Sequence, residues 1–248
     1  MPELEKYVKQ YVVKSYETDC RGNLRIVTLM NWLQDIAVEN AELLGFGFDV
    51  CRQKNLAWVG ANYLLKIERF PRLDEHIIIE TWPAEAKLWG AIRDFLLKDD
   101  AGNVIIRASS QWALIDYARR RPVPLQKHFP KYSYRAERAI DADFAKMEIP
   151  EKIDAIYEYT VRFDDVDINH HVNNAVYSLW ASESVAKDFR LGHIPHKIEL
   201  NFKKEALYGE IVVVETTQKE KVSTHVMRDK TSNAVLAECR IEWINVAA

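Results

Sequence analysis

The residues best suited to acid–base chemistry lie together in the stretch Val166–Asn174. Asp167, Asn169 and His171 follow one another at every second position, so a carboxylate, a carboxamide and an imidazole fall within five residues. In an extended backbone this spacing sends all three side chains to one side. Such a set can activate a water molecule, orient a carbonyl group and fix the proton of an imidazole.

A helix is predicted directly after this stretch, over 175–189, and Asn173 or Asn174 can cap its start. Backbone N–H groups at the start of a helix favour negative charge. Those near Val172–Asn174 are therefore candidate donors to an oxyanion. The side chain of His170 would point the other way in an extended strand, and we interpret it as structural.

Composition limits the kind of protein that this chain can be. Its 248 residues suffice for one large or two smaller domains, and 48% hydrophobic residues predict a folded globular protein. The net charge of −3 argues against a nucleic-acid-binding role. Cys20, Cys51 and Cys239 form no CxxC or Cys/His cluster, which favours a reducing compartment and predicts no zinc or other metal site.

The sequence shows no targeting or membrane-spanning pattern. Its start, Met1 to Lys6, does not resemble a signal peptide, and no plastid-type leader precedes Tyr7. No apolar run approaches the roughly 20 residues needed to span a bilayer. We therefore expect a cytoplasmic protein without a membrane span.

The chain is predicted to contain two copies of one unit, each with a long helix and about five antiparallel strands. When the halves are aligned, Asp19 falls on Asp167 and Trp112 falls on Trp243. This pattern predicts an α+β fold made of two tandem units. Chance agreement between two unrelated α+β domains is the weaker alternative.

The two copies differ in the residues that can do chemistry. In the alignment, His171 falls on Asn23 and Glu205 falls on Phe70, so only the second copy has the imidazole and a second carboxylate. We expect one catalytic site per chain, in the second copy. The first copy is then available to form a substrate pocket.

The predicted boundaries are a first unit over 1–118, a linker over 119–155 and a second unit over 156–248. The linker contains prolines, and its part over 119–138 carries many more cations than acids. A solvated charged surface is the simpler interpretation of such a run. A docking site for an acidic partner is the alternative, because a basic surface steers such partners.

These motifs together resemble the acyl-[acyl-carrier-protein] thioesterase family. The resemblance covers nearly the whole chain, and its strongest motif is Asp-x-Asn-x-His-Val-Asn-Asn at 167–174. Supporting motifs are Asn31-Trp32-Leu33-Gln34, Gly45-Phe46-Gly47, Glu80-Thr81-Trp82, Arg93-Asp94-Phe95 and Asn201-Phe202-Lys203-Lys204-Glu205. The family implies a tandem (double) hot-dog fold, in which two antiparallel sheets are each wrapped around a long helix.

By this resemblance, Asp167, Asn169, His171 and Glu205 occupy the catalytic positions. Many members have a cysteine directly after the glutamate, but Ala206 stands there in this chain, so a thiol nucleophile is excluded at that position. Either Glu205 or His171 can be the general base, and Asp167 can hold the imidazole in one tautomer. Attack by water and a covalent anhydride route both stay open.

The implied reaction is hydrolysis of acyl-acyl-carrier-protein, which releases a free fatty acid and ends chain growth without a cofactor. Alternatives are an acyl-CoA thioesterase, a hydratase and a non-catalytic acyl-binding protein. The predicted lining of the acyl pocket is Leu33, Ile36, Ala37, Leu56, Trp58 and Val59. Acyl carrier proteins are strongly acidic, and the candidate docking residues are Arg119, Arg120, Arg121, Lys127 and Lys131. A further homodimer stays open.

Overall fold

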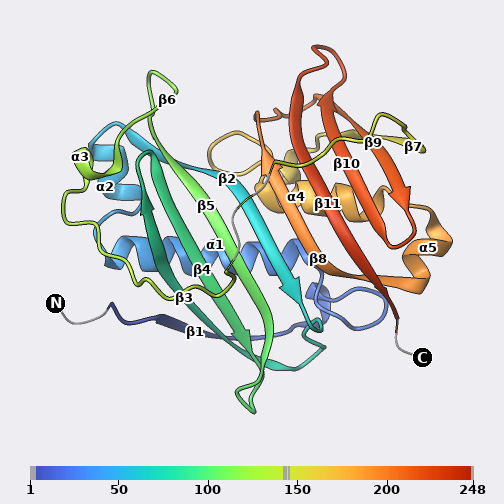
Figure 1. Ribbon diagram of the computed structural model, residues 1–248, viewed down its shortest axis with the longest axis horizontal. Helices are drawn as coiled ribbons and strands as arrows, with labels where there is room; N and C mark the ends of the chain where they lie inside the picture. The colour runs from blue at the N-terminus through green and yellow to red at the C-terminus, as the bar shows by residue number, and fades with distance from the viewer. Residues whose placement is uncertain (1–3, 142–143, 145, 247–248) are drawn as a thin grey trace. The chain divides into compact units, whose positions relative to one another are not determined.

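The computed structural model of the protein describes residues 4–141, 144 and 146–246. The chain divides into two compact units, Met1–Asp143 and Phe144–Ala248 (Figure 1). None of the helices formed by the described residues is both long enough and apolar enough to cross a membrane.

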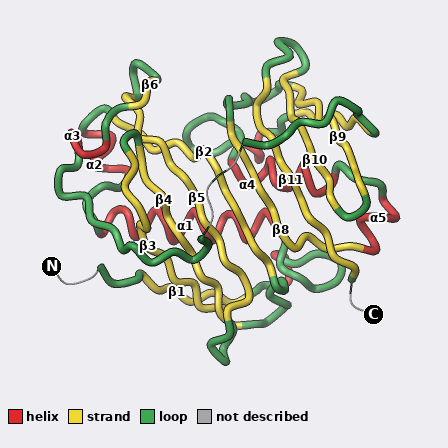
Figure 2. Tube along the Cα trace, viewed as in Figure 1, coloured by secondary structure: helices red, strands yellow, loops and turns green. Residues whose placement is uncertain are grey.

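The first unit is an antiparallel sheet with a long helix on one face (Figures 1 and 2). The sheet has the order β1-β3-β4-β5-β2, and the short β6 pairs with β5. Its strands are β1 (Tyr7–Val12), β2 (Leu56–Ile67), β3 (His76–Lys87), β4 (Gly90–Lys98), β5 (Val104–Asp116) and β6 (Arg121–Pro122). Its helices are α1 (Ile26–Leu43), α2 (Phe48–Gln53) and α3 (Leu125–His128), and Ser15–Glu17 forms a 3-10 turn.

The long helix α1 has the apolar stripe that its sequence predicts. Leu29, Leu33 and Ile36 are all 0% exposed, at the spacing that places side chains on one face of an α-helix. Burying each of these leucine or isoleucine side chains contributes about 1.5–3 kcal/mol. This stripe therefore fixes which face of α1 packs into the unit.

The second unit repeats the same order of elements. Its sheet has the order β7-β9-β10-β11-β8, which is the order of the first sheet with each strand replaced by its counterpart. Its strands are β7 (Ala155–Thr160), β8 (His193–Phe202), β9 (Ile211–Lys219), β10 (Val222–Asp229) and β11 (Val235–Asn245). Its helices are α4 (Asn174–Glu183) and α5 (Lys187–Gly192), and Phe163–Asp165 forms a 3-10 turn. The identical strand orders confirm the predicted internal repeat.

The prediction of one helix over 175–189 is wrong, because the helix stops at Glu183 and a second one begins at Lys187. The Oγ atom of Ser182 donates a hydrogen bond to the Leu179 carbonyl, a contact that competes with regular helical bonding. Ser184, the residue after α4, has its hydroxyl 3.0 Å from the Tyr159 hydroxyl on β7. This contact to the sheet accompanies the change of direction, which apolar periodicity cannot reveal.

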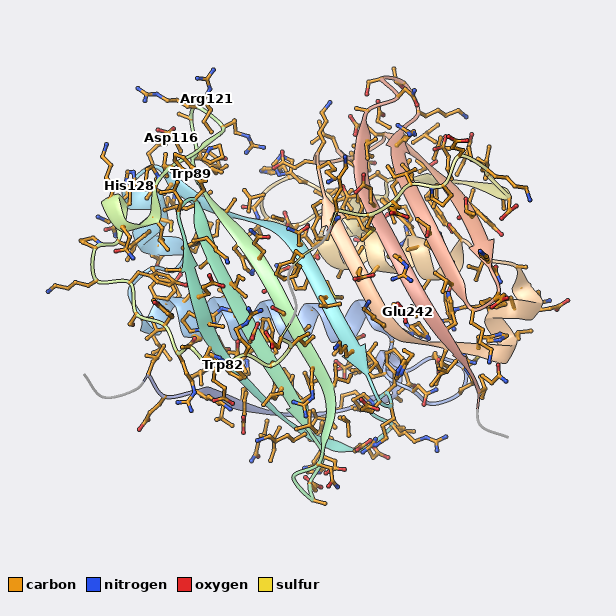
Figure 3. All side chains as sticks on the ribbon, in the orientation of Figure 1. Trp82, Trp89, Asp116, Arg121, His128 and Glu242 are labelled. Atoms are coloured by element: carbon orange, nitrogen blue, oxygen red, sulfur yellow. The ribbon has the colours of Figure 1, made fainter. Side chains whose placement is uncertain are left out.

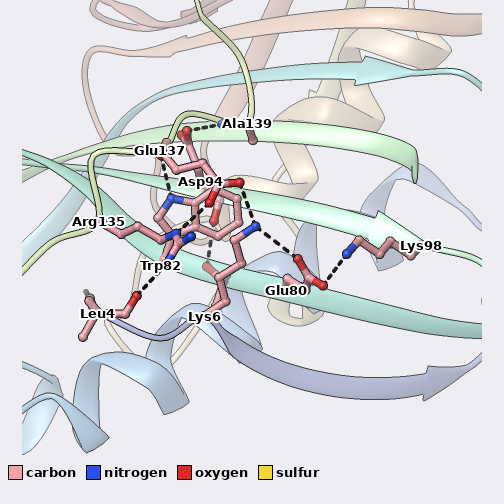
Figure 4. Close-up of polar contacts among 10 residues, drawn as sticks. Leu4, Lys6, Glu80, Trp82, Asp94, Lys98, Arg135, Glu137 and Ala139 are labelled. Atoms are coloured by element: carbon pink, nitrogen blue, oxygen red, sulfur yellow. Dashed lines mark hydrogen bonds and ion pairs between the residues drawn. The ribbon is translucent and has the colours of Figure 1, made fainter. Parts of the chain in front are cut away.

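Much of the stretch predicted as a linker packs onto the first unit. The indole of Trp82 donates a hydrogen bond of 2.8 Å to the Glu137 carbonyl (Figure 4). Arg138 Nε lies 2.9 Å from the buried carboxylate of Asp94. The side chains of Leu125 and Phe129 are buried as well. Prolines exclude long regular elements from this stretch, but the apolar and charged residues between them still make tertiary contacts.

Candidate active site

The motif 167–174 begins in a tight turn rather than in an extended strand. Val166 and Val172 form an antiparallel bridge, the Asp167 N–H donates to the His171 carbonyl at 2.9 Å, and the His170 N–H donates to the Asp167 carbonyl at 2.9 Å. His170 has φ = 64°, in the left-handed region. The expectation that alternate residues share one side of an extended backbone is therefore wrong for this loop.

Asp167 stabilises this turn through its own side chain. Its Oδ1 accepts a 2.8 Å hydrogen bond from the Asn169 N–H, and its Oδ2 lies 3.4 Å from Asn169 Nδ2. Asp19 does the same in the first unit, where its Oδ1 accepts from the N–H groups of Arg21 and Asn23. The aspartate therefore shapes the loop in both copies, and in the second it also places the Asn169 amide.

The imidazole of His171 meets a different carboxylate. Its Nε2 lies 3.2 Å from Oε2 of Glu205, and both side chains are partly exposed. In the part of the chain that the structure describes, Asp167 makes no hydrogen bond to this imidazole. The carboxylate beside the imidazole of His171 is thus that of Glu205 rather than that of Asp167.

Two backbone contacts hold the segment of Glu205 against the motif. The Val172 N–H donates a 3.0 Å hydrogen bond to the Ala206 carbonyl, and the Ala206 N–H donates a 3.1 Å bond to the Tyr177 hydroxyl on α4. Glu205 follows β8 and precedes β9, so its position depends on these bonds rather than on a strand. The pair of His171 and Glu205 is therefore assembled from parts that are far apart in sequence.

The start of α4 lies directly after the motif. Asn173 is its N-cap, and its Oδ1 accepts a 2.9 Å hydrogen bond from the Ala175 N–H. The N–H groups of Val172 and Asn173 donate to the carbonyls of Ala206 and Asp165, so neither remains available to a ligand. Among the three predicted oxyanion donors, only Asn174 has an N–H without a partner in the described residues.

Most of the predicted acyl-pocket lining is buried in the first unit. Leu33 and Ile36 are 0% exposed and Ala37 and Leu56 are also buried, whereas Trp58 and Val59 are partly buried. The indole of Trp58 donates a 2.8 Å hydrogen bond to the Phe46 carbonyl.

A pocket of about 250 Å³ lies elsewhere, on β9 and β10 of the second unit. Its lining includes Ile149, Pro150, Glu215 and Arg228. It contains none of the predicted site residues, and it therefore does not serve as the predicted acyl pocket.

The cations of the basic run divide into two groups, and all the predicted docking residues belong to the first. Arg119, Arg120, Arg121, Lys127 and Lys131 are exposed on and after the turn that joins β5 to β6. Two other cations of the same basic run, Arg135 and Arg138, instead bind Glu137 and Asp94 within the first unit.

Sequence reasoning missed an exposed apolar turn beside these cations. Leu88 and Trp89, between β3 and β4, are 65% and 48% exposed. Their carbonyls accept hydrogen bonds of 2.9 Å from the N–H groups of Leu125 and Leu114. Figure 3 shows Trp89, Arg121 and His128 at the same end of the first unit. The turn residues after the apolar strand β3 were the signal that could have identified this tip.

Comparison with known proteins supports the predicted family on sequence. A family model described as "Acyl-ACP thioesterase N-terminal domain" matches residues 4–132, and one described as "Acyl-ACP thioesterase C-terminal domain" matches residues 148–245. Oleoyl-acyl carrier protein thioesterase 1, chloroplastic, of Arabidopsis thaliana is 29% identical over 234 residues, which are 85% of this chain and 63% of that protein. Palmitoyl-acyl carrier protein thioesterase, chloroplastic, of Gossypium hirsutum is 26% identical over 246 residues, which are 92% of this chain and 57% of that protein. The chain thus spans about three fifths of the length of these relatives.

Solved structures agree with the fold. The 12:0-ACP thioesterase from Umbellularia californica superposes with a TM-score of 0.86 at 23% identity, over 97% of this chain and 98% of that one. An acyl-ACP thioesterase from Bacteroides thetaiotaomicron superposes with a TM-score of 0.81 at 21% identity, over 96% and 98% of the two chains. These likenesses confirm the predicted α+β tandem hot-dog fold. With two consecutive domain matches that span most of its length, the chain belongs to the acyl-ACP thioesterase family.

Proposed function

We propose that the protein hydrolyses the thioester of acyl-acyl-carrier-protein and releases a free fatty acid, which ends chain growth. The observation that carries this proposal is the contact of 3.2 Å between His171 and Glu205, next to the start of α4. This acid–base pair lies at the positions that the family motif predicts. No thiol follows Glu205, where Ala206 stands.

The contact assigns a role to each nitrogen of the imidazole. We assign the proton of the neutral imidazole to Nε2 of His171, because a carboxylate only accepts hydrogen bonds and Oε2 of Glu205 lies 3.2 Å from this nitrogen. Nδ1 is then the unprotonated nitrogen, and it has no partner among the residues that the structure describes. Nδ1 of His171 acts as the general base toward water, and Glu205 stabilises the imidazolium that forms.

The remaining steps need an oxyanion donor and a leaving group. Water loses its proton to His171 as its oxygen bonds to the thioester carbon, and the carbonyl oxygen becomes an oxyanion. The N–H of Asn174, at the positive end of α4, and the amide of Asn169 are the donors suited to this charge. The C–S bond then breaks and the carrier leaves as a thiolate. It departs readily because an alkyl thiol like that of cysteine has a pKa of about 8.5.

The first unit supplies the other half of the proposed substrate recognition. Its buried stripe around Leu33, Ile36 and Ala37 receives the acyl chain, since each methylene buried contributes about 0.8 kcal/mol. The exposed cations around Arg119 and Lys127 steer the acidic carrier protein, and the exposed Trp89 beside them supplies an aromatic contact.

The test of this proposal compares one acyl chain on two carriers. We expect a higher kcat/KM for the acyl chain on carrier protein than for the same chain on coenzyme A. Equal or higher kcat/KM on coenzyme A would instead support an acyl-CoA thioesterase. Binding of both substrates without release of fatty acid would support a non-catalytic acyl-binding protein.

A further inference from the structure

A buried cation without an acidic partner lies on β4 of the first unit. Arg93 is 6% exposed. Its Nη1 donates hydrogen bonds to Asn40 Oδ1 at 2.7 Å and to Thr81 Oγ1 at 3.2 Å. Both partners are neutral. The adjacent carboxylate of Asp94 is bound by Arg138 instead, at 2.9 Å. Within the described part of the chain, Arg93 forms no ion pair.

Part of this guanidinium has no protein partner. A guanidinium has five N–H donors, and the two hydrogen bonds of Arg93 both leave from Nη1. The three N–H groups on Nε and Nη2 thus remain without a partner among the described residues. Burial lowers the pKa of Arg93 to about 10, which still leaves it charged at neutral pH.

The second unit shows that the fold itself does not need this charge. Thr81 on β3 pairs with Phe95, two residues after Arg93. The equivalent Thr216 on β9 pairs with His225, two residues after Ser223. Ser223 is therefore the counterpart of Arg93. Ser223 is neutral and fully buried, and its hydroxyl accepts a 2.8 Å hydrogen bond from the Trp243 indole. A small neutral residue therefore completes the sheet in the sister unit. An unpaired buried charge is unfavourable unless hydrogen bonds or an opposite charge compensate it, and two hydrogen bonds to neutral groups do so only in part.

Arg93 lies beside the predicted lining of the acyl pocket on its helical side. Leu33, Ile36 and Ala37 are on one face of α1, and Asn40 continues that face by one turn. Because Asn40 holds Arg93 at 2.7 Å, the guanidinium borders the buried stripe that we assign to the acyl chain.

The aromatic side of the predicted lining is near as well. The ring of Tyr132 is 6.4 Å from that of Trp58 and 4.5 Å from that of Phe46. Burial raises the pKa of Tyr132 to about 12, and the positive charge of nearby Arg93 opposes that rise. The charge therefore acts within the same buried region as the aromatic lining.

We propose that Arg93, held by Asn40 and Thr81, is a subsite for acyl chains that carry an oxygen substituent. The substituent is a hydroxyl, oxo or carboxylate oxygen that accepts hydrogen bonds from the N–H groups on Nε and Nη2. An apolar cavity would reject such a chain, because its oxygen would lose its hydrogen bonds to water. This inference rests on the proposed function, in which the first unit receives the acyl chain.

The test uses a panel of acyl-carrier thioesters of one chain length. Some chains are unsubstituted, and others carry a hydroxyl or oxo group at a different position in each substrate. A last substrate has a carboxylate at the end of the chain. In the wild type we expect a position at which the substituted chain is hydrolysed as well as, or better than, the plain chain. In Arg93→Met, kcat/KM for that substrate should fall about ten- to hundredfold, as for loss of a hydrogen bond to a charged group. Its value for the plain chain should fall much less, so the ratio between the two substrates reports on the subsite.

Two further variants separate this subsite from a general effect on folding. Asn40→Asp keeps the size of the side chain but gives Arg93 a built-in carboxylate, so it should abolish the preference without removing the cation. Ser223→Ala, at the equivalent position of the second unit, should leave the ratio between substituted and plain chains unchanged.

Calorimetric binding of the corresponding free acids provides a readout that does not depend on turnover. The substituted acid should bind the wild type more tightly than it binds Arg93→Met or Asn40→Asp. A ratio between substituted and plain chains that is the same in the wild type and both variants overturns the subsite. Failure to hydrolyse any thioester, with the binding preference intact, would overturn the proposed function alone.

Discussion

Two adjacent histidines have different surroundings in the candidate active site. The imidazole of His171 contacts Glu205, whereas His170 is exposed and occupies the left-handed region at φ = 64°. The equivalent residue of the first unit is Gly22, at φ = 75°, so His170 stands where the loop geometry favours glycine. Only one of the two imidazoles is thus placed for acid–base work.

This difference gives a prediction with a matched control. We expect His171→Ala to lower kcat by about 10²–10⁴-fold, the usual contribution of a general base. His170→Gly should keep the rate near that of the wild type, because glycine adopts the same backbone conformation. Steady-state hydrolysis of an acyl-carrier thioester measures both variants, and an equal loss in the two would contradict the assignment.

At this scale the sequence predicted residue types better than their contacts. The structure brings His171 and Glu205 to 3.2 Å from each other, and both positions could be inferred from the asymmetry between the copies and from the family resemblance. The sequence could not show which partner the Asp167 carboxylate takes. An aspartate can hydrogen-bond either a nearby side chain or the backbone two residues ahead, and here it accepts from the Asn169 N–H. Nor could the sequence show that the Val172 N–H donates a hydrogen bond to the Ala206 carbonyl.

Among the elements, α4 depends on its cap. The Asn173 side chain satisfies the Ala175 N–H at the start of this ten-residue helix. We expect Asn173→Ala to lower the free energy of unfolding by about 1 kcal/mol, and Asn173→Ser to lower it much less, because serine can also cap. Urea unfolding compares the two variants, and equal losses would show that the cap does not contribute.

The second sheet contains a buried hydrogen-bonded chain that makes stability depend on pH. Nε2 of His225 lies 2.8 Å from Ser223 Oγ and its Nδ1 lies 2.9 Å from Thr216 Oγ1. Burial lowers the pKa of His225 to about 3 from its usual value near 6.5. The unfolded chain therefore binds a proton in this window that the folded protein does not bind, so stability rises with pH between about 3 and 6.5.

We accordingly expect protonation linked to His225 to lower the free energy of unfolding in acid by at most about 5 kcal/mol. This is the free energy that such a pKa difference represents. In His225→Gln the unfolding free energy should depend less steeply on pH over the same window, even if the variant is less stable at neutral pH. Urea unfolding at several pH values measures the slope. The same slope in both proteins would show that His225 is not the titrating group.

For elements, periodicity predicted α1 well but did not predict where α4 ends. The stripe of α1 is uninterrupted, so spacing alone was sufficient. In the second copy the apolar pattern continues through Val185, which is buried although α4 ends at Glu183. The contact between Ser184 and Tyr159 involves a strand distant in sequence, which spacing cannot reveal.

At the scale of the whole molecule, the basic run has two physical roles. Arg135 donates to the Leu4 carbonyl and Arg138 binds Asp94, so both hold the run on the first unit, whereas Arg119 and Lys127 are exposed. Sequence alone could not separate these roles, because it did not show that Asp94 is buried and needs a cation. It did predict the two-unit architecture, because the repeat appears in the order of elements.

The exposed group gives a prediction about carrier recognition. Replacing Arg119, Arg120 and Arg121 by glutamate should raise KM for carrier-bound substrate by about tenfold or more at low salt, since opposed charges steer encounter. A small acyl thioester should be hydrolysed as before. Steady-state kinetics on both substrates checks this, and equal effects on them would reject docking at this surface.

Lys66→Glu is a suitable control for this experiment. Lys66 is an exposed cation near the end of β2. Leu56, at the start of the same strand, pairs with Asp116, which lies next to the basic turn. Lys66 is ten residues further along, so at about 3.3 Å per residue it lies about 33 Å from Leu56. Its charge reversal should leave KM for the carrier-bound substrate nearly unchanged.

The most direct test of the account is single-turnover release of fatty acid from an acyl-carrier thioester by the wild type and by Glu205→Gln. Glutamine keeps a hydrogen-bond acceptor near His171 but cannot stabilise an imidazolium through charge. We predict hydrolysis by the wild type and a rate at least about 10²-fold lower in the variant. Wild-type protein that releases no fatty acid, or a variant that is as fast as the wild type, would contradict a thioesterase built on this pair.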